Sequence, residues 1–102
     1  MPRLDTKNWP EGFMINTVIT VPNRAGLHAR AAAKLVATAS AFRSRIELAN
    51  DEKCVDGKSI LSLMLLAAPQ GSELTLTLEG EDEQDALQAI LNLIEERFGE
   101  AD

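Results

Sequence analysis

Polar and hydrophobic residues alternate along the chain at residues 14–21, 44–49 and 73–79. This alternation is typical of strands that bury one face. A polar turn at residues 50–52, followed by a short strand at residues 53–56, predicts a hairpin. The side chains expected to face the core are Thr17, Ile19, Val21, Ile46, Leu48, Leu74, Leu76 and Leu78.

Between and after these strands, hydrophobic residues recur every three to four positions, which predicts helices. We expect helices at residues 29–42, at residues 60–66 after an N-cap at Ser59, and from residues 81–83 to Gly99. The side chains expected to be buried are Ala32, Leu35, Val36, Ala39 and Phe42 in the first helix, Leu63 and Leu66 in the second, and Leu87, Ile90, Leu91, Ile94 and Phe98 in the third.

The element order β-α-β-β-α-β-α favours an α+β domain over residues 14–102, with a four-stranded antiparallel sheet and three helices on one face. Residues 1–13 contain two prolines and a glycine without periodicity, and are expected to form a flexible N-terminal extension. Trp9 in this extension could pack on the domain, contact a partner or be solvated, and packing is slightly favoured.

The only histidine, His28, lies where a strand has turned into the start of a helix, two residues after Gly26. The first amides of a helix lack intrahelical acceptors, and the dipole adds roughly +0.5 charge, so this position binds anions and disfavours imidazolium. Arg30 adds a permanent cation that can bind phosphate. The arrangement indicates a nucleophilic histidine that accepts and passes on a phosphoryl group, although a capping or surface histidine has the same pattern.

Composition excludes several other classes. The net charge of -6 and the pI near 4.7 argue against nucleic-acid binding. No hydrophobic run approaches the ~20 residues of a membrane span. One histidine and one cysteine cannot supply the four ligands of a structural zinc site, and the single Cys54 is consistent with a reducing cytoplasm and an inert thiol. The segment 57–59 (GKS) lacks the earlier glycine of a phosphate-binding loop, since residue 52 is glutamate.

Residues 26–35 (GLHARAAAKL) resemble the active-site signature of HPr, the histidine-containing phosphocarrier family of the bacterial phosphoenolpyruvate-dependent phosphotransferase system. The resemblance extends in order over roughly residues 14–98. Its further segments are 57–61 (GKSIL), 67–71 (AAPQG) and 79–84 (EGEDEQ). One departure is Ala31, where the family usually has proline, and we expect the helix to persist with a less rigid start.

The resemblance implies an HPr-like open-faced β-sandwich and a monomeric cytoplasmic carrier with no turnover of its own. His28 would accept the phosphoryl group, on Nδ1 by family analogy, from the phosphorylated first enzyme of the system and deliver it to IIA-type proteins. The backbone amides of Ala29 and Arg30 and the Arg30 guanidinium would hold the phosphoryl oxygens. No metal or organic cofactor is implied.

The second helix is hydrophobic on nearly every side, so part of it is expected to stay exposed and bind a protein partner. By resemblance, Ile60, Leu61 and Met64 form this docking surface. Ser59 matches the serine that an HPr kinase/phosphorylase modifies in some family members, although a plain helix cap is an equal explanation.

Two alternatives stay open. The element order also fits a ferredoxin-like regulatory domain that binds a small molecule without phosphoryl transfer. Within the family, the spacer Arg24-Ala25 resembles the nitrogen-related branch, whereas residues 58–60 (KSI) resemble the kinase-regulated sugar branch.

Overall fold

The computed structural model describes residues 14–101, so the predicted extension at residues 1–13, with Trp9, lies outside the described residues. The elements are β1 (Ile15–Thr20), α1 (Ala29–Ser40), β2 (Arg45–Ala49), β3 (Cys54–Asp56), α2 (Ile60–Leu66), β4 (Glu73–Glu79), α3 (Glu83–Glu95) and the 3₁₀ turn η2 (Arg97–Gly99). The predicted element order is therefore confirmed.

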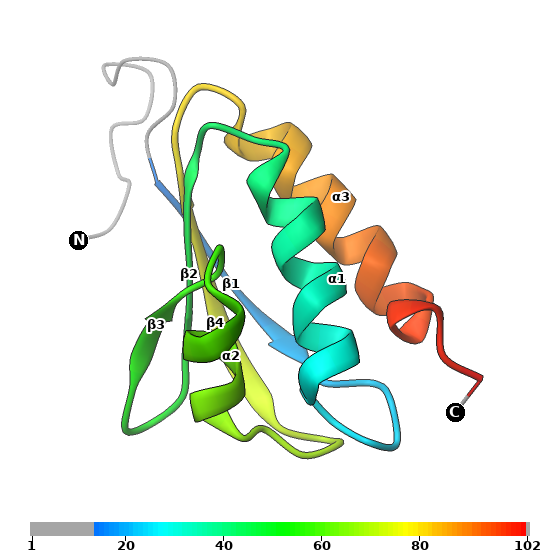
Figure 1. Ribbon diagram of the computed structural model, residues 1–102. Coiled ribbons are helices and arrows are strands. Elements are labelled where there is room, and N and C mark those ends of the chain that lie inside the picture. Colours follow the sequence, from blue (N-terminus) through cyan, green and yellow to red (C-terminus); the bar gives the residue numbers. More distant parts are fainter. Residues whose placement is uncertain (1–13, 102) are drawn as a thin grey trace.

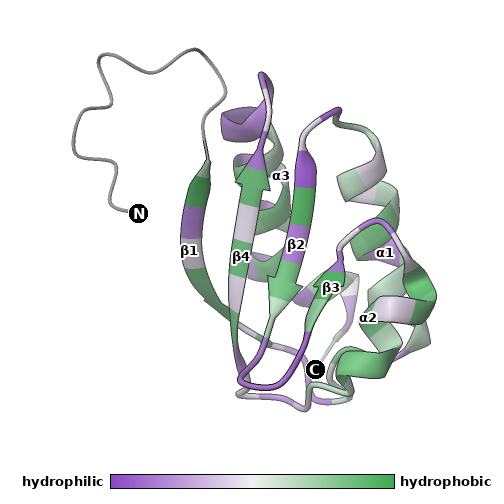
Figure 2. Cartoon of the chain, turned by 90° about the vertical axis from the view of Figure 1, so that its left-hand side faces the viewer, coloured by the Kyte–Doolittle hydropathy of each residue, from purple (hydrophilic) through white to green (hydrophobic). Residues whose placement is uncertain are grey.

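The four strands form one antiparallel sheet in the order β1-β4-β2-β3. The three helices cover one face of this sheet (Figure 1), and no helix within residues 14–101 covers the other face (Figure 2). The register brings inward-facing side chains together, because Leu76 of β4 pairs with Thr17 of β1 and Leu48 of β2. This is the four-stranded, three-helix architecture that the alternating pattern predicted.

The buried faces agree with the pattern except in α1 and α3. Ala31 is fully buried in α1, although the pattern left it out of the core. In α3, Leu91 is 38% exposed and Ala86 is buried in its place. The buried side of α3 centres on Ala86 and Ile90, which are one turn apart, and Leu91 lies about 100° further round the helix.

The predicted helix ends need two corrections. α1 stops at Ser40 rather than residue 42, and α3 stops at Glu95 rather than continuing to Gly99. After α3, residues 97–99 all have left-handed φ values of 55°, 56° and 75°, which a regular right-handed helix cannot contain. After this turn the C-terminal segment meets the start of α1, where Glu100 contacts His28.

Asp82 joins the start of β2 to the start of α3. Its carboxylate accepts hydrogen bonds from the backbone amides of Arg43 and Ser44, at 2.8 and 2.9 Å, and from the Ser44 hydroxyl. The Ser44 hydroxyl is the largest of the effects that hold the pKa of Asp82 below its ordinary value.

We expect Asp82→Asn to lower the melting temperature at pH 7, because an amide cannot accept all three hydrogen bonds. A carboxyl whose pKa is lowered on folding stabilises the protein above its unfolded pKa, and this stabilisation is lost as the pH falls below it. The difference between variant and wild type should therefore shrink below pH 3.8. Thermal melts at pH 7 and pH 3 measure it. Glu81→Gln, an exposed neighbour with the same change of charge, is the control, and equal losses in both variants at pH 7 would contradict this role.

Candidate functional site

The loop before α1 is pressed against the loop after α2. Gly26 has a φ of +78°, and a side chain there would place its Cβ 2.6 Å from the carbonyl oxygen of Ala68. The amide of the buried Leu27 donates to the same oxygen at 2.9 Å. Only glycine fits both the backbone conformation and the close approach, and the result fixes the position of the next residue, His28.

His28 is the N-cap of α1, and its side chain is 37% exposed. The Arg30 amide donates to His28 Nδ1 at 3.3 Å, and His28 Nε2 lies 2.9 Å from Glu100 Oε2. Because a backbone N–H can only donate, Nδ1 is unprotonated and Nε2 carries the proton that it donates to Glu100. The lone pair of Nδ1 therefore points to the start of the helix, where the Arg30 amide donates to it.

Glu100 reaches His28 through the η2 turn. Phe98 is 2% exposed and anchors the turn in the core, and Lys34 Nζ donates to its carbonyl oxygen at 2.8 Å. Arg97 and Phe98 both have positive φ without being glycine, which costs about 1 kcal/mol or more each. The packing of Phe98 and the Lys34 contact hold this strained turn in place.

Asn23 holds Glu100 from the other side. Its Nδ2 donates to Glu100 Oε1 at 2.9 Å and to the carbonyl oxygen of Gly26 at 2.8 Å. Both neighbours are acceptors, so the amide nitrogen must face them, and the buried Oδ1 has no partner within the described residues. The hydrogen bond from Asn23 is the largest of the effects that lower the pKa of Glu100. Desolvation opposes it, whereas His28 and Arg30 lower the pKa further. Glu100 is therefore ionised at pH 7.

Two hollows adjoin His28 on the surface. The first, which we call the histidine hollow, has a volume of about 560 Å³; its lining residues are Arg24, Ala25, His28, Arg30, Gly99, Glu100 and Ala101. The second, of about 310 Å³, is lined by Ala25, Leu27, His28, Ala29, Met64, Ala67, Ala68 and Pro69. The structure thus brings the predicted residues His28, Ala29 and Arg30 together and places Met64 beside them.

The other predicted residues lie along α2. Ser59 caps the helix and its Oγ accepts from the Ser62 amide at 3.2 Å. Leu63 and Leu66 are buried, as the spacing predicted. Four hydrophobic side chains are exposed and form what we call the α2 patch: Ile60 at 41%, Leu61 at 72%, Met64 at 41% and Leu65 at 60%. Leu65 is the member that the sequence prediction missed.

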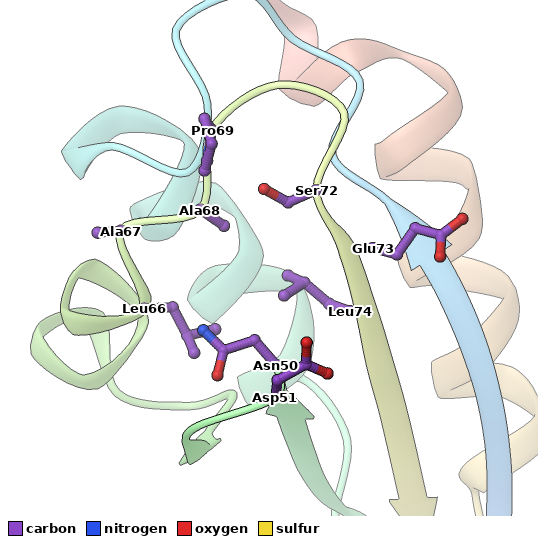
Figure 3. A pocket seen from close by; sticks show the side chains of 9 residues that line it. All are labelled: Asn50, Asp51, Leu66, Ala67, Ala68, Pro69, Ser72, Glu73 and Leu74. Atoms are coloured by element: carbon purple, nitrogen blue, oxygen red, sulfur yellow. The ribbon is translucent and has the colours of Figure 1, made fainter.

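A third hollow lies on the other side of the loop at residues 67–72 (Figure 3). Asn50 and Asp51, from the turn between β2 and β3, line it together with Leu66, Leu74 and Glu73. It contains two carboxylates and neither His28 nor Arg30, so it does not suit an incoming phosphoryl group.

Sequence reasoning missed Asn23 and Glu100 as residues of the site. The sequence pattern gave neither residue a contact with His28. They lie 77 residues apart. No local periodicity links them, and only the turn at residues 97–99 brings them together.

The comparisons with known proteins agree on one family. The family model described as "PTS HPr component phosphorylation site" matches residues 15–96. The phosphocarrier protein HPr of Pseudomonas aeruginosa is 49% identical over 85 residues, which cover 82% of this chain and 94% of that protein. That of Cupriavidus necator is 46% identical over 89 residues, covering 87% and 100%. The chain belongs to the HPr family.

A comparison with solved structures supports the same family. An HPr crystal structure from Thermoanaerobacter tengcongensis superposes with a TM-score of 0.80 at 45% identity, covering 84% of this chain and 97% of that one. The protein is therefore an HPr phosphocarrier of the phosphotransferase system, a phosphoryl relay carrier whose family membership implies enzyme I and IIA-type partners. This sets aside the ferredoxin-like regulatory alternative.

None of the helices within residues 14–101 is long and hydrophobic enough to cross a membrane. In the same part of the chain, histidine, cysteine and carboxylate side chains nowhere gather in a group of three or more that could hold a metal ion.

Proposed function

We propose that His28 carries the phosphoryl group of this HPr, on Nδ1. The observation that carries the proposal is the hydrogen bond from the Arg30 amide to Nδ1, because it leaves that nitrogen with a lone pair at an anion-binding helix start. His28 is also the only histidine in the chain. The partial exposure of its ring gives a donor protein access.

The chemistry is an in-line transfer between two histidines. The lone pair of His28 Nδ1 forms the new N–P bond while the bond from phosphorus to the donor histidine breaks, and the donor nitrogen keeps that electron pair. The Arg30 amide, which rests on Nδ1 in the unphosphorylated protein, then turns to a phosphoryl oxygen together with the Ala29 amide. The Arg30 guanidinium, exposed at the rim of the histidine hollow, binds the same oxygens.

The test is an incubation of the protein with phosphoenolpyruvate and enzyme I, followed by intact-mass measurement. The protein should gain the mass of one phosphoryl group, lose it in acid, and pass it to a IIA-type protein. Peptide mapping should place the group on residue 28. A label that survives acid, or that maps elsewhere, would contradict the assignment to His28.

We also propose that the α2 patch is where enzyme I and the IIA-type proteins bind. Met64 lines the same hollow as His28, which makes the patch continuous with the proposed phosphoryl site. Its centre is Leu61, the most exposed of the four side chains at 72%. A protein partner that covers the patch also surrounds His28 and excludes water from the transfer.

We expect Leu61→Asp to weaken binding to enzyme I by about 2 kcal/mol, or roughly 30-fold, because it buries an unpaired charge in the contact. The melting temperature should change little, since Leu61 is largely exposed. Titration calorimetry and melting curves measure both quantities. Leu91→Asp, at an exposed leucine of α3, is the control. Normal binding by Leu61→Asp would show that the interface lies elsewhere.

We also propose that Ser59, the N-cap of α2, is a regulatory site at the edge of this patch. A phosphate there would add about -2 charge beside Ile60 and Leu61, while the N-terminus of α2 would tolerate it. Ser59→Asp in the same titration should weaken binding in the same direction. We further predict that an HPr kinase/phosphorylase modifies Ser59, and that the protein is a cytoplasmic monomer. The sugar branch and the nitrogen-related branch are both retained as alternatives.

A further inference from the structure

We infer that Glu100, held in place by Asn23, is a positioning residue that fixes the tautomer of His28 for phosphoryl acceptance. The inference rests on the proposed role of His28 and adds to it a residue that lies beyond residues 15–96, the part matched by the family model. Its basis is the chain of contacts from Asn23 Nδ2 to Glu100 Oε1 and from Glu100 Oε2 to His28 Nε2, each 2.9 Å long.

The two oxygens of Glu100 have different hydrogen-bond partners. Oε1 accepts from the buried Asn23 amide, so the carboxylate cannot turn away without leaving that amide partly unpaired. Oε2 therefore faces His28 Nε2 as an acceptor, and Nε2 must be the nitrogen that carries the proton. The Arg30 amide imposes the same tautomer from the other edge of the ring. Both contacts leave the lone pair on Nδ1.

The position of Glu100 is built into the fold. The strained turn at Arg97 and Phe98, the buried Phe98 ring and the hydrogen bond from Lys34 all direct the next residues back to the start of α1. Gly99 completes the turn with a φ of +75°. A Cβ added at this residue would lie 2.7 Å from Lys34 Nζ. Together these four features hold the backbone of residue 100 beside the start of α1.

Glu100 also matches the charge that phosphoryl transfer creates. When Nδ1 bonds to phosphorus and Nε2 keeps its proton, the imidazole ring becomes a cation. The Glu100 carboxylate lies against Nε2 and pairs with that cation. A carboxylate near a phosphoryl group normally repels it. This repulsion is reduced here, because Glu100 is hydrogen-bonded to Nε2 and not to Nδ1, and because the cationic Arg30 lines the same hollow.

The substitution Glu100→Gln tests this arrangement with little change in shape. A glutamine has an oxygen at only one of the two positions that the carboxylate oxygens occupy, so it cannot present an acceptor to Asn23 Nδ2 and another to His28 Nε2. If its oxygen stays on Asn23, its NH₂ group faces His28 Nε2 and favours the tautomer with the proton on Nδ1. Glu96→Gln is the matched control, because Glu96 is an exposed carboxylate of the same C-terminal segment and the charge change is identical.

The measurement combines ¹⁵N NMR of the histidine ring at pH 8 with the rate of phosphoryl transfer from enzyme I. His28 is the only histidine, so its ring signals are unambiguous. Wild type and Glu96→Gln should show a protonated Nε2 and an unprotonated Nδ1. Glu100→Gln should shift both ring signals toward the other tautomer and slow transfer by about 10–100-fold, the scale of one strong hydrogen bond.

The outcomes separate this inference from the proposed function. Wild-type ring signals in Glu100→Gln would overturn the positioning role, whether or not transfer slows, and so would a wild-type transfer rate. Either result leaves His28 as the phosphoryl acceptor. If instead the wild-type protein is not phosphorylated on His28 at all, the proposed function fails, and the ring signals then report only a structural contact.

Discussion

The His28→Ala variant is expected to accept no phosphoryl group from phosphoenolpyruvate and enzyme I, while it stays folded. No other imidazole exists in the chain to take over the transfer. The substitution removes the N-cap hydrogen bond to the Arg30 amide, a loss of about 1 kcal/mol, which a folded domain tolerates. Acid-labile labelling measures phosphorylation, and circular dichroism with thermal melts measures folding.

Ser59→Ala is the matched control for this variant. It removes the N-cap hydrogen bond of α2, as His28→Ala removes that of α1, but it leaves the proposed acceptor unchanged. It should lose a similar small amount of stability and accept the phosphoryl group normally. Acid-labile label on His28→Ala, at any level close to wild type, would refute the assignment of the acceptor.

The Arg30→Ala variant should slow phosphoryl transfer by about 10–1000-fold, or roughly 1.4–4 kcal/mol in activation free energy. The guanidinium is exposed beside His28 at the histidine hollow, where it can bind the phosphoryl oxygens as they leave the donor. The backbone amide of residue 30 is kept in the variant, so the cap of α1 and the unprotonated Nδ1 should persist. Rapid-quench kinetics with phosphorylated enzyme I measure the rate.

Arg43→Ala provides the comparison, because it removes an arginine side chain with the same charge far along the chain from His28. It should transfer at the wild-type rate, apart from weak long-range attraction that salt screens. Arg30→Lys should recover part of the rate, since an ammonium keeps the charge but loses the two-pronged geometry. A wild-type rate in Arg30→Ala would mean that the backbone amides alone hold the phosphoryl group.

The sequence by itself determined the elements and most of their faces. In β4, Leu74, Leu76 and Leu78 alternate with polar residues, and all three are buried, because a strand turns successive side chains to opposite sides. The range of α2 was predicted correctly from its hydrophobic run and the cap at Ser59. The proposal for His28 has the same kind of basis, because a helix start and its anion-binding amides are local features of the chain.

Only the tertiary structure decided what surrounds His28 and which sides of the helices are covered. Leu91 is exposed and Ala86 buried because the contact side of α3 depends on how close the helix comes to its neighbours, which a hydrophobic period alone does not fix. Glu100 lies 72 residues from His28 and meets it through a left-handed turn held by the burial of Phe98. Such a contact depends on packing between distant segments, and no periodicity or local motif encodes it.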